Sequence, residues 1–366
     1  MVLVPLENPI RNYAWGSTEF LAQLQGRTPA GQPEAELWMG AHPEAPSLVQ
    51  GQPLGDWLGA PPSFLLKILA AAEPLSLQAH PTLEQAQNGY RRENEAGLPV
   101  KSPLRNYRDP NHKPELITAL GPFVALCGFR PCDEILRRFS ALGLDALGPC
   151  MDALKAQDLA LFFHKLMTLP GREKVAQAVA RHLFDPSEDP EARWVLRLAE
   201  RYPGDIGILS PFYLNLIHLL PGEGLYLPAG ELHAYLHGNG VELMACSDNV
   251  LRGGLTPKHV DVPELLSVLN FRPRNPPILR PEPAGAAAAW YSTPAREFEL
   301  GVVHPDSAHE IQLEQPELWL VTEGELRVED IWLRPGQAAW ATVGTRAQLL
   351  PPLTLYRART NTRHFC

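Results

Sequence analysis

The chain has 366 residues, which is enough for about two domains, or three, and for a sizeable hydrophobic core. Lysine and arginine together number 32 and aspartate and glutamate 41, so the formal net charge is −9. Proteins that bind the phosphate backbone of nucleic acids carry a basic footprint, so this balance argues against that class. It does not exclude a small anionic substrate, because a basic pocket can lie in an acidic protein.

The sequence carries no targeting or membrane signal. Residues 1–13 lack the charged-then-apolar layout of a signal peptide, and no apolar run approaches the roughly 18 residues of a membrane span. The five cysteines include no Cys-x-x-Cys pair, which favours free thiols and argues against a thiolate zinc site. We therefore expect a cytoplasmic protein.

The first 130 residues mix short apolar runs and prolines with one helical stretch, residues 82–94. Thr82 and Gln85 make a capping-box pattern at its start, and Gly97 and Pro99 follow its end. The next segment, residues 131–203, has apolar residues at spacings of three and four between proline and glycine breaks. The helices predicted there are Glu134–Phe139, Met151–Met167, Glu173–Phe184 and Glu191–Tyr202.

Strand-like texture returns after the helical segment. Residues 210–269 carry short apolar runs, residues 272–283 hold five prolines and resemble a linker, and residues from 287 onward alternate short strands with turns. Strands at this spacing favour a barrel or jelly roll. We predict a mainly β protein with two jelly-roll β-barrels and an inserted small α-helical domain. The expected domains are 1–130 with 206–270, 131–205, and 271–366.

The strongest local motif is PGEGLYLPAGELHAY, residues 221–235. Gly222, Pro228 and Gly230 provide turns around one strand, and His233 begins the next. The spacing resembles the second conserved motif of cupins, small barrels that often hold a metal. An inward imidazole is a good ligand for a divalent transition metal, whereas the alternative is a core histidine bonded to a backbone carbonyl.

A second motif is LSLQAHP, residues 75–81. The two-residue period of a strand places Ser76, Gln78 and His80 on one face. A buried polar face needs a partner, which a metal would supply. The alternative is a polar strand face in solvent.

Two further segments concentrate charge. NYRDPNHKPEL, residues 106–116, packs His112, Lys113 and Glu115 between prolines that restrict the backbone. VELMACSDNVLRGGLTPK, residues 241–258, sets cations among glycines, which suits a phosphate or an enolate-like anion. The alternative for each is an exposed, solvated loop.

Taken together, these segments resemble type I mannose-6-phosphate isomerases (phosphomannose isomerases). NPIRNYAWG at residues 8–16, AELWMGAHPEAPS at 35–47 and FLLKIL at 64–69 are similar to further motifs of that family. The resemblance covers roughly residues 6–129 and 210–266. No family motif is matched in the helical segment or in the C-terminal β region.

The resemblance implies a site residue by residue. It implies one Zn²⁺ held by Gln78, His80, Glu115 and His233, a donor set that suits this ion. It implies that Ser76, Lys67 and Lys258 line the pocket that binds the phosphosugar. The residues implied in catalysis are Arg252, Lys113, His112, Asp248 and Glu242.

The implied reaction interconverts mannose 6-phosphate and fructose 6-phosphate through a cis-enediol. It needs ring opening, a base for the carbon-bound proton, and positive charge near the enediolate oxygens. Lys113 or Glu242 is the expected base, with His112 and Asp248 assisting ring opening, and Arg252 acts on the enediolate or clamps the phosphate. The expected partner is a small phosphosugar, with no nucleic acid and no membrane, and the resemblance favours a monomer.

Two other functions remain open at this point. One is a cupin-type sugar-binding or regulatory protein that has lost catalysis, although the intact set of implied ligands, with Arg252 and Lys113, argues against it. The other is a different cupin enzyme, such as an epimerase or a dioxygenase. A dioxygenase would more often show a histidine-rich or facial-triad pattern where Gln78 and His80 stand.

Overall fold

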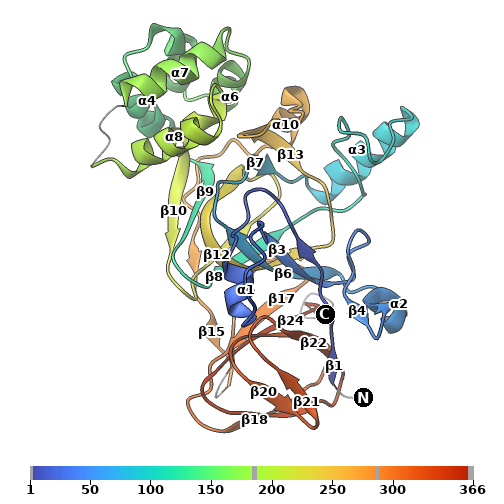
Figure 1. The fold of residues 1–366 in the computed structure, drawn as a ribbon. Helices are drawn as coiled ribbons and strands as arrows, with labels where there is room; N and C mark the ends of the chain where they lie inside the picture. Colours follow the sequence, from blue (N-terminus) through green and yellow to red (C-terminus); the bar gives the residue numbers. More distant parts are fainter. Residues whose placement is uncertain (1–2, 184–187, 286–287, 362–366) are drawn as a thin grey trace.

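The structure is a computed structural model that describes residues 3–183, 188–285 and 288–361. Two large antiparallel sheets dominate these ranges, so the protein is mainly β (Figure 1). None of the described helices is long and apolar enough to cross a membrane. Cys127, Cys132, Cys150 and Cys246 are free thiols, as expected, and Cys366 lies outside the described residues.

The larger sheet has eleven strands within the described ranges and carries most of the predicted motifs. Its central strand β6 is buried along all eight residues, and Lys67 is the one charged side chain in it. The main path runs β14-β11-β8-β12-β6-β3-β2, and β7, β9, β10 and β13 pair off this path. The strands are β2 (Ile10–Arg11), β3 (Glu36–Gly40), β6 (Phe64–Ala71), β7 (Leu77–Ala79), β8 (Glu115–Ala119), β9 (Phe123–Phe129), β10 (Leu214–Leu219), β11 (Gly224–Leu227), β12 (His233–Ala245), β13 (Leu251–Gly254) and β14 (Ile278–Leu279).

Strand β12 joins the two halves of this sheet. Its first residues pair with β7 and β9, and its residues from Gly238 onward pair with β6 and β8. Gly238 has a φ of 121°, and a Cβ there would lie 2.6 Å from the Pro122 carbonyl oxygen, so the crossing requires glycine. His233 and Glu242 therefore stand on one strand but in different halves of the sheet.

The second sheet has seven strands within the described ranges, in the order β1-β22-β19-β24-β17-β16-β15. Buried side chains of both sheets, such as Leu66 and Val241 with Leu320 and Trp340, form one shared core. Its strands are β1 (Leu3–Pro5), β15 (Glu282–Pro283), β16 (Ala288–Trp290), β17 (Glu299–Val303), β19 (Glu317–Gly324), β22 (Ala338–Ala341) and β24 (Leu353–Arg359). Three short hairpins or pairs accompany the sheets: β4 (Leu48–Val49) with β5 (Gln52–Pro53), β18 (His309–Gln312) with β23 (Arg346–Leu349), and β20 (Leu326–Val328) with β21 (Ile331–Leu333).

The first strand does not follow the expected division of the chain. The sequence assigned residues 1–130 to one domain, but Leu3 pairs with Ala341 of the C-terminal sheet and is completely buried. A strand of three residues carries an apolar pattern but no signal for the sheet that it joins.

The helical segment projects from two strands that pair with each other, β9 and β10. Figure 1 shows its helices at one end of the molecule, with the β18, β20 and β21 strands at the other. The segment contains α4 (Cys132–Ala141), α5 (Gly148–Lys155), α6 (Leu159–Met167), α7 (Arg172–His182), α8 (Pro190–Arg201), and the 3-10 turns Asp145–Leu147 and Ile206–Leu209.

Three predicted segments differ from the observed helices. Residues 151–167 form two helices, because Gln157 has a φ of 58° and Asp158 caps α6 by accepting the Leu161 N–H. The strand-like region expected from residue 210 begins with a short helix, α9 (Ser210–Tyr213), and its first strand is β10. The helix expected at 173–184 ends at His182, and Phe184 lies outside the described residues.

The other helices surround the larger sheet: α1 (Phe20–Leu24), α2 (Leu54–Leu58), α3 (Leu83–Glu95) and α10 (Val262–Val268). In α3 the predicted capping box is confirmed, because Thr82 and Gln85 each bond the other residue's backbone N–H through their side chains.

Candidate active site

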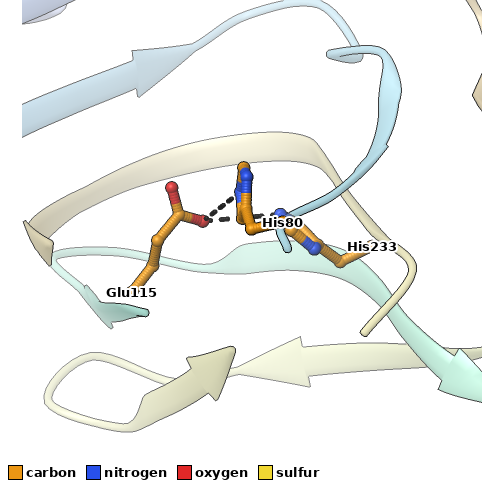
Figure 2. Close-up of side chains that lie close together, drawn as sticks. All are labelled: His80, Glu115 and His233. Carbon is orange, nitrogen blue, oxygen red and sulfur yellow. Dashed lines mark ion pairs between the residues drawn. The ribbon is translucent and has the colours of Figure 1, made fainter. Parts of the chain in front are cut away.

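Three side chains converge at the ends of three strands. His80 follows β7, Glu115 begins β8 and His233 begins β12, and all three are buried (Figure 2). Oε2 of Glu115 lies 3.4 Å from Nε2 of His80 and 3.4 Å from Nε2 of His233. The ligand-type atoms of the three residues all lie within 4.8 Å of one another, which is a spacing that fits one metal ion.

Hydrogen bonds fix the orientation of both imidazoles. Nδ1 of His80 lies 2.7 Å from the Asn249 carbonyl oxygen, and Nδ1 of His233 lies 2.9 Å from that of Glu231. A carbonyl only accepts, so the proton is on Nδ1 and the Nε2 lone pair faces Glu115. Both Nε2 atoms and Oε2 of Glu115 are buried without a hydrogen-bond partner. Three converging acceptors of this kind need a cation between them.

The protonation states suit a metal centre. Burial, opposed by the charge of Glu115, lowers the pKa of His80 to about 4. Burial alone would raise the pKa of Glu115, but above all the charge of the Lys113 ammonium holds it well below its usual range. Neutral imidazoles and an ionised carboxylate are the forms that bind a divalent metal.

Sheet register sets Gln78 beside this cluster. Gln78 is paired with His233 on one side and with Arg252 on the other, across β12, β7 and β13. The side chains of Gln78 and Arg252 are thereby placed in one row with that of His233, a member of the cluster. Gln78 and Glu115 also line a cavity of about 810 Å³.

This cavity brings together most of the predicted site residues. Those that line it are Lys67, Ser76, Gln78, Lys113, Glu115, Glu242, Asp248, Arg252 and Lys258. His112 does not, because its Nε2 lies 2.6 Å from Oε1 of Glu297. His112 therefore does not lie at the cavity, where a residue that assists ring opening would have to lie. Alternating residues of a bent loop point in different directions, so Lys113 faces the cavity and its neighbour does not.

One wall of the cavity holds a closed network of charges. Nζ of Lys67 lies 3.1 Å from Glu242 and 3.7 Å from Glu36, and the Tyr235 hydroxyl donates to Glu242 at 2.9 Å. Burial alone would lower the pKa of Lys67, but the two carboxylates raise it above its ordinary value. Lys67 is thus a cation that is already neutralised by its neighbours.

The opposite charge balance is found at Arg108, Arg252 and Lys258. Burial and the repulsion of Arg108 lower the pKa of Arg252, and burial with the repulsion of both arginines lowers the pKa of Lys258. The lowered pKa values of Arg252 and Lys258 show that each of these cations lies close to like charges. All three line the cavity, so this group is suited to receive an anion.

Asp248 is the cavity carboxylate that a histidine supports. Nε2 of His42 lies 3.4 Å from Oδ1 of Asp248, and Nδ1 of His42 accepts the Glu44 N–H at 3.3 Å. Burial raises the pKa of Asp248, but His42, Lys113 and Arg108 outweigh it and hold the pKa below its usual value. The carboxylate is therefore ionised at neutral pH and faces the cavity.

The sequence of this chain is similar to known proteins along most of its length. A sequence profile for "Phosphomannose isomerase type I, catalytic domain" matches residues 3–60 and 51–132. Mannose-6-phosphate isomerase of Escherichia coli strain K12 is 36% identical over 368 residues, covering 92% of this chain and 93% of that protein. The chain belongs to the type I phosphomannose isomerases.

Solved structures agree with this membership. The apo form of mannose 6-phosphate isomerase from Salmonella typhimurium has a TM-score of 0.89 and 32% identity, covering 99% of this chain and 100% of that chain. A zinc-bound holo mannose 6-phosphate isomerase gives a TM-score of 0.87 and 32% identity at the same coverage. The resemblance drawn from the motifs is confirmed.

The contacts point to three other residues that the sequence analysis did not include among the expected site residues. His42 lies in the AELWMGAHPEAPS motif, Arg108 in the charged loop, and Asn249 between Asp248 and β13. Their positions inside matched motifs were the available signal. Their partners come from other segments of the chain, however, so no local pattern predicted their roles.

Proposed function

We propose that this protein interconverts mannose 6-phosphate and fructose 6-phosphate. The observation that carries the proposal is the buried cluster of His80, Glu115 and His233 with its three unpartnered acceptor atoms. Glu115 also lines the adjoining cavity, together with the cations Arg108, Arg252 and Lys258. A phosphosugar needs both features, because its anion requires cations and its enediolate requires positive charge.

We propose Zn²⁺ as the metal and Gln78, His80, Glu115 and His233 as its ligands. The zinc-bound structural relative supports the ion, and the donor set of imidazole, carboxylate and amide oxygen suits it. The ion supplies Lewis-acid stabilisation of negative charge on the sugar oxygens when it is bound. We also propose two cupin-like barrels, with domains 1–130 plus 206–270, 131–205 and 271–366. The two large sheets and the helical insertion support this division, except that β1 pairs with β22 of the C-terminal sheet.

Of the two candidate bases, the contacts favour Glu242. Both side chains line the cavity. Lys113 donates to Glu115, so its ammonium is committed to a carboxylate. The oxygens of Glu242, by contrast, keep lone pairs beyond those that accept from Lys67 and Tyr235. Burial raises the pKa of Glu242, opposed by the charge of Lys67, and a raised pKa suits a carboxylate that takes and returns a proton near neutral pH. Lys67 and Tyr235 orient this carboxylate.

The remaining roles follow from position. Arg252, in the same row as Gln78, stabilises negative charge on the enediolate oxygens. Asp248 moves the proton between O1 and O5 during ring opening, while Arg108, Lys258 and Ser76 bind the phosphate. We give His112 no role in ring opening, because its side chain is held by Glu297. The free thiols favour the cytoplasm as the location.

Proton exchange tests this function directly. Zinc-loaded protein is incubated with mannose 6-phosphate in D₂O and followed by NMR. The proposal predicts formation of fructose 6-phosphate with deuterium at C1, and the reverse reaction from fructose 6-phosphate with deuterium at C2. Absence of both products in a sample with one zinc per chain would overturn the function.

A further inference from the structure

Asn249 lies at the junction between the metal cluster and the cation group, and it is fully buried. It follows Asp248 and precedes β13, the strand that carries Arg252. The loop that faces it carries Arg108 and Asp109 and leads to Lys113 and Glu115. Asn249 therefore contacts the segment that connects Arg108 of the cation group to Glu115 of the metal cluster.

The side-chain amide of Asn249 is saturated by the backbone of this facing loop. Its Oδ1 accepts the N–H of Arg108 at 2.7 Å and that of Asp109 at 3.3 Å. Its Nδ2 donates to the carbonyl oxygens of Asp109 at 2.7 Å and Asn111 at 2.8 Å. One amide thus holds the backbone of Arg108, Asp109 and Asn111 in a segment without regular structure.

The main chain of Asn249 serves the metal cluster. Its carbonyl oxygen accepts the Nδ1 proton of His80 at 2.7 Å, which turns the Nε2 lone pair towards Glu115. Two further bonds tie the same segments together: the Asp248 N–H donates to Asp109 at 2.8 Å, and the Ser247 hydroxyl donates to the Asn111 carbonyl at 3.1 Å.

We propose that Asn249 is a positioning residue that couples the imidazole of the metal ligand His80 to the anion-binding loop at Arg108. The inference rests on the proposed function for the identity of the metal and the anion. The amide fixes the Arg108 backbone, and the same residue's carbonyl fixes His80, so a displacement of one moves the other. Asn249 itself does not line the cavity and so is not a catalytic residue.

The chemistry requires an amide at this position. An aspartate has the same shape but no N–H, so Asn249→Asp sets a carboxylate against the carbonyl oxygens of Asp109 and Asn111. Asn249→Ser removes the clamp without adding charge and serves as the milder variant. Asn361→Asp is the matched control, because the buried Nδ2 of Asn361 donates to the Ala295 carbonyl at 2.7 Å on the C-terminal side of the molecule.

The test measures binding rather than turnover. Zinc affinity is determined by competition with a chromogenic chelator, inorganic phosphate affinity by calorimetry on zinc-loaded protein, and unfolding by denaturant titration. Both Asn249 variants are expected to lose about tenfold to a hundredfold in zinc affinity, because they disturb the group that orients the His80 imidazole, and about tenfold in phosphate affinity. Asn361→Asp is expected to lose stability while both affinities stay within about twofold of wild type.

The coupling would be overturned if the Asn249 variants lose stability only, with zinc and phosphate affinities within about twofold of wild type. If Asn249→Asp does not fold, Asn249→Ser carries the same test. Failure of the proposed function has a different signature. In that case wild-type protein does not isomerise mannose 6-phosphate, while the Asn249 variants still bind zinc more weakly than wild type.

Discussion

Glu115 and Glu317 are both buried carboxylates, one in each large sheet, and their surroundings are opposite. Glu317 accepts hydrogen bonds from Arg357 at 2.6 and 2.7 Å and from the Trp319 indole at 2.8 Å. Oε2 of Glu115 has no donor and faces two imidazole nitrogens that also lack one. Glu317 therefore finds its hydrogen-bond partners within the chain, whereas Oε2 of Glu115 needs a cation as its partner.

The comparison also shows which observation is decisive. Other buried polar atoms lack a partner, among them the Tyr213 hydroxyl and Oε1 of Glu231, and they stand singly. Only the cluster of His80, Glu115 and His233, among the residues that the structure describes, brings three metal-binding groups within 4.8 Å. Convergence rather than a lone unpaired atom therefore marks the functional centre.

The largest expected effect separates these two carboxylates. Glu115→Gln should lose zinc and lower kcat/KM by at least about 10³-fold, since it removes an anionic ligand. Glu317→Gln should retain one zinc and near wild-type kcat/KM but lower the free energy of unfolding by about 3 to 5 kcal/mol. Zinc analysis, steady-state kinetics and denaturant titration check both variants. Retained zinc and activity in Glu115→Gln would contradict the comparison.

A smaller effect is expected from Arg252→Ala. Because Arg252 stands in the row of Gln78, its loss should lower kcat about 10²-fold and change KM by less than about threefold. Arg280→Ala is the control, since that exposed guanidinium pairs with Glu223 outside the cavity. A raised KM with normal kcat would instead assign Arg252 to the phosphate.

Lys258→Ala should act on binding. Loss of one unneutralised cation from the anion-binding group should raise KM about tenfold, with kcat near its wild-type value, and weaken the salt dependence of KM. Lys155→Ala, which removes an exposed lysine paired with Asp152, is the control. An equal fall in kcat would show that Lys258 acts in the transition state.

The smallest expected effect concerns pH. Burial raises the pKa of Asp248 and His42 lowers it, so His42→Ala should raise that pKa. The base form of Asp248 then disappears at a higher pH, and the acidic limb of the kcat/KM profile should move upward. His42→Gln keeps a donor and should restore most of the wild-type profile. An unchanged pH profile of kcat/KM in His42→Ala would show that the His42–Asp248 pair does not set the acidic limb of the reaction.

The motifs allowed the convergence of His80, Glu115 and His233 to be predicted because each lies on a short segment with fixed strand or turn geometry. Gln78 precedes His80 by one strand period, and His233 begins a strand after a glycine turn. The joining of β1 to the C-terminal sheet and the partner of His112 depend on distant segments. The break at Gln157 is local, set by the positive φ of Gln157 and the Asp158 cap of α6. The hydrogen bonds of Asn249 and His42 also cross between segments, so periodicity could not reveal them.

The most direct test of the account is a coupled assay of mannose 6-phosphate isomerisation before chelation, after verified metal removal, and after addition of Zn²⁺. The account predicts that activity is lost with the metal and returns at one zinc per chain. Activity that persists in protein with verified absence of metal would contradict the metal-dependent mechanism. No activity in verified zinc-loaded protein would contradict the assigned reaction.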